Sequence, residues 1–152
     1  MTHSNSITCI KRVHFCYGHR LVNHPGKCAT LHGHNAFVEI HARRIAADTN
    51  ELLDKDGMVV DFGILKSAIG GWIDEHWDHN TILSKDDTDT IELVSKCPGI
   101  KKPYILPYNP TAENLARYLL EEVCPKELAG HDTEVFKILF QETPSGHAEA
   151  AK

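Results

Sequence analysis

The sequence predicts an α+β fold, and three observations carry that prediction. Residues 7–17 are rich in β-branched and aromatic side chains, and residues 34–44 alternate between apolar and polar ones, as strands do. Two later stretches, which begin near Asp61 and Asn109, repeat apolar residues at helical spacing. A last strand pattern covers residues 134–142. Strands paired in sequence, with helices covering one face, define this class.

Composition limits the kinds of protein that this chain can be. Its 152 residues predict a single domain over residues 1–152. A formal net charge of −5 argues against a nucleic-acid-binding face. No apolar run approaches the ~20 residues that cross a bilayer, and the first residues lack the apolar stretch of a secretory signal. Five cysteines, an odd number without paired spacing, favour a reducing compartment. We therefore expect a cytoplasmic protein that binds neither nucleic acid nor a membrane.

The first half of the chain is expected to form two strands and a helix. Turn-forming residues separate the two strands at positions 18–30, and a polar turn follows at positions 50–57. Asp61 is placed to cap the helix that comes next. Its apolar face follows helical spacing through Leu65, Ala68, Ile69, Trp72, Ile73 and His76.

A long polar stretch, residues 84–109, contains three prolines and is expected to be a loop with a short strand at 104–106. The acidic group Asp86, Asp87 and Asp89 is expected to be solvated there. A second helix then follows, because Asn109 or Thr111 can cap it and Pro110 suits its first turn. Pro125 is expected to end this helix.

The final strand carries a charged residue on an apolar face. With period two, Phe136, Ile138 and Phe140 share a face with Glu142. An ionised carboxylate in such a place needs partners. It suits the N–H and NH₂ pair of a heterocycle such as guanine or pterin. The alternative is that Glu142 lies past the end of the strand, in solvent.

The segment His32-Gly33-His34 is the clearest indication of chemistry. Residues two apart in an extended backbone point to the same side, so both imidazoles can meet at one point. A third imidazole from the neighbouring strand would complete a zinc site with one open position, as catalytic zinc sites have. His19 is the natural third ligand because it closes the first strand, and His14 and His24 are weaker candidates.

Two further groups extend this hypothesis. Cys28 is either a fourth ligand, which would close the site structurally, or a reactive thiol whose pKa a nearby cation or Lys27 would lower. Asp78-His79 places a carboxylate beside an imidazole, as acid–base catalysis requires. Adjacent residues need not face each other, and the alternative is a surface pair.

Several stretches in a fixed order carry a resemblance to a known family. They are Phe15-Cys16-Tyr17-Gly18-His19-Arg20-Leu21, Cys28, His32-Gly33-His34, Val60-Asp61-Phe62, Asp78-His79, Pro110-Thr111-Ala112-Glu113-Asn114-Leu115 and Gln141-Glu142-Thr143. With these stretches the chain resembles the 6-pyruvoyltetrahydropterin synthase superfamily, and within it the bacterial 6-carboxytetrahydropterin synthases. The three-residue gap between Cys28 and His32 is similar to the carboxy-forming branch.

The resemblance implies a fold and an assembly. The fold is the tunnelling fold, a β-β-α-α-β-β unit with an antiparallel sheet and helices on one face. Such units assemble into oligomeric barrels, so a homo-oligomer built from trimers, including hexamers, is implied, with active sites between subunits.

The resemblance also implies the roles of the site residues. The zinc ligands are His19, His32 and His34. Proton transfer falls to Cys28, Asp78 and His79, while Glu142 holds the pterin ring with help from Thr111. The substrate implied is 7,8-dihydroneopterin triphosphate. The products are 6-carboxytetrahydropterin, acetaldehyde and triphosphate, in the queuosine and 7-deazapurine route.

Three points stay open at the level of sequence. The reaction could instead form the pyruvoyl product or act on a related pterin. A non-enzymatic protein with a closed structural zinc site is a more remote alternative. The groups that hold triphosphate in a net-acidic protein are not evident, and Arg20 and Lys27 are the candidates.

Overall fold

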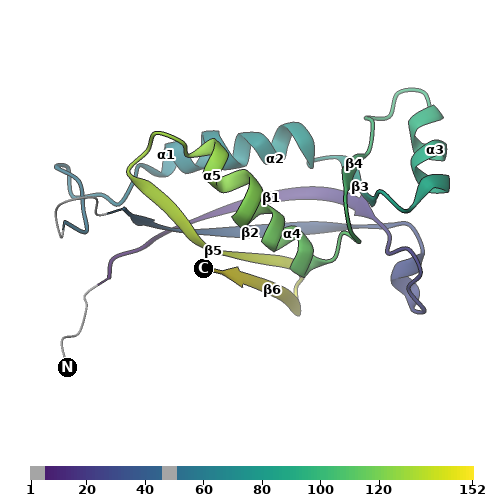
Figure 1. The fold of residues 1–152 in the computed structure, drawn as a ribbon, viewed down its shortest axis with the longest axis horizontal. Helices are drawn as coiled ribbons and strands as arrows, with labels where there is room; N and C mark the ends of the chain where they lie inside the picture. The colour runs from purple at the N-terminus through teal and green to yellow at the C-terminus, as the bar shows by residue number, and fades with distance from the viewer. Residues whose placement is uncertain (1–5, 46–50) are drawn as a thin grey trace.

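One curved sheet of six strands carries α1, α2, α4 and α5 on one face, while α3 lies beyond the ends of the long strands (Figure 1). The computed structural model describes residues 6–45 and 51–152, so Asn50, where the expected polar turn begins, lies outside the described residues. The rest of that turn is confirmed, because the Gly57 N–H donates to the Asp54 carbonyl at 3.0 Å. The strand order across the sheet is β4-β3-β1-β2-β5-β6.

The strands have the following bounds. They are β1 (Cys9–His19), β2 (His32–Arg44), β3 (Asn80–Ser84), β4 (Tyr104–Leu106), β5 (Thr133–Thr143) and β6 (Gly146–Ala151). The β1 and β2 strands thus match the two strands expected from the alternation, within two residues at each end.

The helical segments fall into two long units and two short elements. The first unit joins α1 (Phe62–Leu65), a π-helical turn (Lys66–Gly70) and α2 (Gly71–His76). The second joins α4 (Ala112–Tyr118), a π-helical turn (Leu119–Val123) and α5 (Cys124–Glu127). The short elements are a 3₁₀ turn (Lys27–Ala29) and α3 (Thr88–Lys96). Within the described residues, none of these helices has the length and apolar character to cross a membrane.

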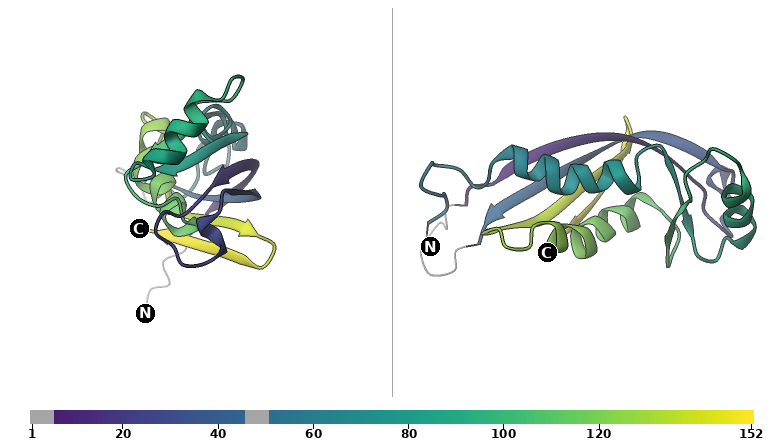
Figure 2. Two further views of the ribbon diagram at one scale, coloured as in Figure 1. Left: turned by 90° about the vertical axis from the view of Figure 1, so that its right-hand side faces the viewer. Right: turned by 90° about the horizontal axis from the view of Figure 1, so that it is seen from above.

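Both long helical units lie along the sheet (Figure 2) and share its core. The caps predicted for them are confirmed: Asp61 accepts from the Gly63 N–H at 2.6 Å, and Thr111 accepts from the Asn114 N–H at 3.2 Å. The largest fully buried side chains come from strands and helices alike. They are Trp77, Phe15, Phe140, Ile40, Leu65, Ile69, Ile73, Ile82, Leu83, Leu106, Leu115 and Leu119.

The sheet is mixed, so the expectation of an antiparallel sheet is wrong at one edge. β1, β2, β5 and β6 pair antiparallel, whereas β3 pairs parallel with β1, and β4 pairs parallel with β3. Hairpin connections give antiparallel neighbours, while a crossover through a helix lets the chain enter the sheet in the same direction. The crossover through α3 accounts for the parallel pair of β3 and β4. β3 follows β2 through α1 and α2 and runs opposite to β2, so it is parallel to β1.

The expected loop at residues 84–109 contains α3, so that prediction is wrong for Thr88–Lys96, whereas the short strand at 104–106 is confirmed as β4. The helix escaped prediction because it has only nine residues and buries only Thr90 and Val94, so its apolar face is short. Asp87 is also not solvated: it is 5% exposed, and its Oδ2 lies 3.5 Å from Arg20 Nε. Arg20 donates to the Thr90 hydroxyl at 3.1 Å as well, so its guanidinium holds α3.

Pro125 does not end the second helical unit, which continues to Glu127. A proline inside a regular α-helix removes one hydrogen bond, and its ring collides with the carbonyl four residues earlier. Here the wider π-helical turn ends at Val123, immediately before α5, and gives the ring of Pro125 the space it needs.

A β-bulge in β5 corrects one further expectation. The register steps from His41 opposite Lys137 to Ala42 opposite Val135, which leaves Phe136 as the extra residue. Val135, Ile138 and Phe140 are therefore buried on the helix-covered face, while the Phe136 ring lies under the Arg43 guanidinium, 5.0 Å away. Phe136 does not share a face with Glu142, contrary to the simple period of two.

Replacing Asp87 by alanine tests the role given to the Arg20 pair. Loss of the buried carboxylate leaves the Arg20 guanidinium without its main partner and should lower the free energy of unfolding by about 1–3 kcal/mol. Urea unfolding measures the change. Asp86→Ala, at an exposed neighbouring position, is the control and should shift stability by less than about 0.5 kcal/mol. Equal stability of the two variants would contradict the assignment.

Candidate active site

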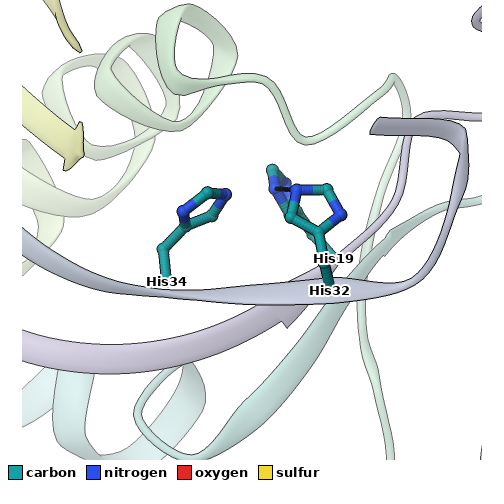
Figure 3. A group of neighbouring side chains, drawn as sticks. All are labelled: His19, His32 and His34. Atoms are coloured by element: carbon teal, nitrogen blue, oxygen red, sulfur yellow. Dashed lines mark hydrogen bonds between the residues drawn. The ribbon is translucent and has the colours of Figure 1, made fainter. Parts of the chain in front are cut away.

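Three histidines converge where β1 ends and β2 begins (Figure 3). The register of the two strands sets His19 directly opposite His32, and His34 opposite Tyr17. Their ring centroids lie 4.6 to 5.1 Å apart, and their ring nitrogens form a group in which every pair is within 4.8 Å. The cluster predicted from the His32-Gly33-His34 pattern and from His19 is therefore present.

Backbone carbonyls fix the orientation of two of these rings. His19 Nδ1 lies 2.7 Å from the Pro110 carbonyl oxygen, and His32 Nδ1 lies 2.6 Å from that of Thr30. Each Nδ1 must donate to its carbonyl, so each Nε2 carries a free lone pair, which is the arrangement of metal-binding histidines.

The Nε2 atoms form a cation site by their chemistry. Those of His19 and His32 face each other at 3.1 Å (dashed in Figure 3), and with both protons on Nδ1 neither can donate to the other. His34 Nε2 is buried and has no hydrogen-bond partner among the described residues. Buried polar atoms are almost always satisfied, so two free lone pairs and a third, unpartnered ring nitrogen at one point fit a divalent cation.

Burial keeps these ligands in the metal-binding form. It lowers the pKa of His19, which is 2% exposed, and it lowers the pKa of His34 as well. Desolvation penalises the charged imidazolium, and the neutral ring is the species that coordinates a metal.

The two weaker histidine candidates do not join the cluster. His14 lies on the opposite face of the sheet, where its ring packs against Phe37 at 4.9 Å. His24 is exposed in the loop between the strands.

Glu142 lies beside the histidines. Its Oε1 is 3.5 Å from His19 Nε2 and 3.6 Å from His34 Nε2, and it accepts a hydrogen bond from the Tyr17 hydroxyl at 2.8 Å. Since β5 extends to Thr143, Glu142 is inside the strand and not in solvent beyond it. Alternation from the buried Ile138 and Phe140 places it on this face.

A cavity of about 260 Å³ adjoins the cluster, and several of the predicted site residues line it. Cys28 and Thr111 line it together with His19 and Glu142. Glu113 and His147 also line the cavity. Sequence reasoning gave Glu113 no role, although it lies in a stretch that carries the resemblance, and it missed His147, which lies in no recognisable pattern. Among the described residues, potential ligand atoms gather tightly in two groups, His19–His32–His34 and Cys16–Asp78–His79, and Cys28 belongs to neither. The geometry therefore favours Cys28 as a thiol facing the cavity over Cys28 as a fourth ligand.

Asp78 and His79 form a contact pair at a different place. Asp78 Oδ1 lies 2.9 Å from His79 Nδ1 and accepts from the Cys16 N–H at 2.9 Å. Burial of Asp78 opposes its ionisation, but these hydrogen bonds outweigh it and lower its pKa. His79 has a φ of 53°, a left-handed conformation that is uncommon for a non-glycine residue. The two side chains therefore do face each other.

The pair is not next to Cys28 in this chain. Side chains alternate along β1, so Cys16, which contacts the pair, lies on the opposite face of the sheet from Tyr17, which contacts Glu142. The structure thus brings the histidines, Glu142, Thr111 and Cys28 to one site, and it places Asp78 and His79 elsewhere.

The fold and this site define a family. The profile described as 6-pyruvoyl tetrahydropterin synthase matches residues 8–152. The chain belongs to the 6-pyruvoyl tetrahydropterin synthase family.

Curated relatives and solved structures agree with that assignment. The chain is 41% identical over 143 residues to the 6-carboxy-5,6,7,8-tetrahydropterin synthase of Rickettsia felis, which covers 94% of this chain and 99% of the relative. It is 28% identical over 142 residues to the protein of the same name from Haemophilus influenzae, with 91% and 94% covered. The Caenorhabditis elegans 6-pyruvoyl tetrahydropterin synthase structure matches with a TM-score of 0.67 and 21% identity, covering 100% of this chain and 99% of that one. An uncharacterised protein structure from Wolinella succinogenes matches with a TM-score of 0.77 and 23% identity, covering 96% and 98%. The structural matches show that the fold is shared.

Replacing one ligand tests the metal site directly. His32→Ala removes one of three converging nitrogens, so zinc content should fall from about one ion per chain to near zero after dialysis. Elemental analysis of the purified protein measures this. His24→Ala, at the exposed loop histidine, should keep its zinc. Full zinc occupancy in His32→Ala would show that the cation is held elsewhere.

Proposed function

We propose that this chain is a zinc-dependent 6-carboxytetrahydropterin synthase. It converts 7,8-dihydroneopterin triphosphate and one molecule of water to 6-carboxy-5,6,7,8-tetrahydropterin, acetaldehyde and triphosphate. The observation that carries the proposal is the set of three converging Nε2 atoms beside a cavity lined by Cys28, Thr111 and Glu142. Relatives that bear this name at 41% identity support the choice of product. The proposal extends to the queuosine and 7-deazapurine route, to a cytoplasmic location and to a single domain.

The histidine cluster would hold the zinc ion. His19, His32 and His34 supply three nitrogen ligands, and a fourth position stays open for the substrate. When bound, zinc supplies Lewis acidity toward the hydroxyl groups of the substrate side chain, which acidifies the neighbouring carbon-bound hydrogens.

Glu142 and Thr111 would bind the pterin ring. A carboxylate presents two acceptor oxygens that match the N–H and NH₂ groups on one edge of the ring. Glu142 lies between the histidines and the cavity, so the ring edge on Glu142 directs the substrate side chain toward the metal. The cavity is small for a pterin triphosphate, since ligand pockets are usually about 300–1,000 Å³.

Proton transfer would use residues from two subunits. Cys28, as a thiolate at the cavity, removes a carbon-bound proton, and an Asp78–His79 pair delivers or accepts the second one. Because the pair and Cys28 lie apart within one chain, we propose that Asp78 and His79 of the partner subunit complete the site. A homo-oligomeric barrel built from trimers, including hexamers, would bring them together and enlarge the pocket.

Arg20 is a weak candidate for holding the triphosphate. Its guanidinium is engaged by Asp87 and Thr90, whereas Lys27 is exposed in the 3₁₀ turn beside Cys28. Lys27 therefore stays the better candidate of the two.

Product analysis tests the activity. The purified protein, incubated with 7,8-dihydroneopterin triphosphate, should release acetaldehyde together with the 6-carboxy product, and a chelator should abolish both. Mass spectrometry identifies the pterin. Triphosphate release without acetaldehyde would point to the pyruvoyl-forming reaction, which the name of the family makes the second candidate. Turnover that survives complete removal of zinc would contradict the proposed mechanism.

Complementation between two inactive variants tests the shared site. Cys28→Ala and His79→Ala should each lose turnover while retaining zinc, because neither residue belongs to the histidine cluster. When the two are co-expressed and assemble at random, about a quarter of the sites should combine an intact Cys28 with an intact His79 of the partner subunit.

Activity of the mixed assemblies measures the outcome. Cys97→Ala, at an exposed cysteine, combined with His79→Ala serves as the control pair. That control pair should also regain activity, in about half of its sites. Cys28 is intact in every chain of this pair, and only His79 is missing, from half of the chains. No recovery with Cys28→Ala would show that both residues act from one chain.

A further inference from the structure

Tyr17 lies on the helix-covered face of the sheet, where it contacts Glu142. Its side chain is 3% exposed, and its hydroxyl donates to Glu142 Oε1 at 2.8 Å. Its ring lies edge-on to His19, with ring centroids 5.0 Å apart, and 5.8 Å from the ring of His34. One side chain therefore touches the carboxylate and two of the three histidines.

We propose that Tyr17 is a positioning residue that fixes the Glu142 carboxylate for pterin binding and keeps it from turning toward the metal. This inference rests on the proposed function, since it assigns to Tyr17 a role in holding the group that receives the pterin.

The need for such a group follows from the position of Glu142. Its Oε1 lies within 3.6 Å of two ring nitrogens that converge on the cation site. Zinc–carboxylate bonds are about 2.0–2.2 Å long, so a small rotation of the side chain would bring this oxygen to the open position. A carboxylate bound there would exclude the substrate hydroxyls. The hydrogen bond from Tyr17 opposes that rotation.

The same hydrogen bond leaves the carboxylate able to bind a ligand. Each carboxylate oxygen has two acceptor sites, so Oε1 can accept from Tyr17 and still accept from a ring N–H. With one oxygen anchored, the plane of the carboxylate is set in advance, which reduces the entropy lost when a planar donor pair binds.

Tyr17 is itself rigid and permanently a donor. Its ring stacks on Phe15 at 5.5 Å and meets the edge of Phe140 at 5.9 Å, so packing fixes its rotamer. A tyrosine phenol ordinarily ionises only near pH 10, about three units above neutral, so the hydroxyl keeps its proton and donates across the range in which enzymes work.

Tyr17→Phe tests this role, because it removes the hydroxyl and keeps the ring packing. Loss of a hydrogen bond to a charged group should raise KM, and the Kd for neopterin as a non-reacting probe, by about tenfold or more. We expect kcat to change less than about twofold and the zinc content to stay the same. Steady-state kinetics, fluorescence titration with neopterin and elemental analysis give the three readouts.

Tyr104→Phe is a matched control, since it also removes a tyrosine hydroxyl from a short hydrogen bond, the 2.7 Å contact with Tyr118, at a distance from Glu142. It should bind neopterin like the unmodified protein. If Tyr17→Phe binds neopterin like this control, or if it loses zinc and kcat together with neopterin binding, the positioning role is wrong.

Glu142→Gln separates the inference from the proposed function. If the unmodified protein does not bind neopterin, the proposed function fails and the inference fails with it. If the unmodified protein binds neopterin and Glu142→Gln does not, the proposed role of Glu142 stands, and the result with Tyr17→Phe alone decides the role of Tyr17.

Discussion

The pairing register of β1 with β2 is the constraint on which the candidate site depends. It sets His19 opposite His32 and Tyr17 opposite His34, so all four side chains share the helix-covered face. A slip of one residue would turn one strand's contribution to the other face. Gly33 lets the strands approach closely at this point, because a Cβ there would lie 2.9 Å from the Tyr17 carbonyl oxygen. The convergence of the three ligands thus depends on how the two strands pair as much as on the presence of the three histidines.

Two other elements supply the remaining residues of the site. The start of α4 supplies the Pro110 carbonyl, which fixes the tautomer of His19, and Thr111, which caps the helix and lines the cavity. β5 supplies Glu142, which alternates with the buried Ile138 and Phe140, while the bulge at Phe136 brings Val135 to the same face. Alternation along the last part of the strand therefore brings the carboxylate to the site.

Much of this arrangement was predictable, since alternation, caps and the His-Gly-His spacing report on interactions that are local in sequence. The strands β1 and β2, the caps Asp61 and Thr111 and the histidine cluster follow from such patterns. The features that sequence reasoning missed depend on contacts between residues far apart in the chain. α3 is a short helix that the contact of Arg20 with the buried Asp87 helps to hold, and Arg20 lies far from it in the sequence. The bulge and the parallel edge are set by partners far along the chain. Tyr17 looked like an ordinary core residue of a strand, and only its contact with Glu142 distinguishes it.

X-ray absorption spectroscopy at the zinc edge of the purified protein tests the central claim most directly. The convergence of three Nε2 atoms predicts a first shell of nitrogen and oxygen alone, at about 2.0–2.1 Å, with the multiple-scattering features of imidazole rings. Adding neopterin should alter only the oxygen contribution. A sulfur scatterer at about 2.3 Å would mean that a cysteine closes the site, and it would contradict a catalytic metal with an open position.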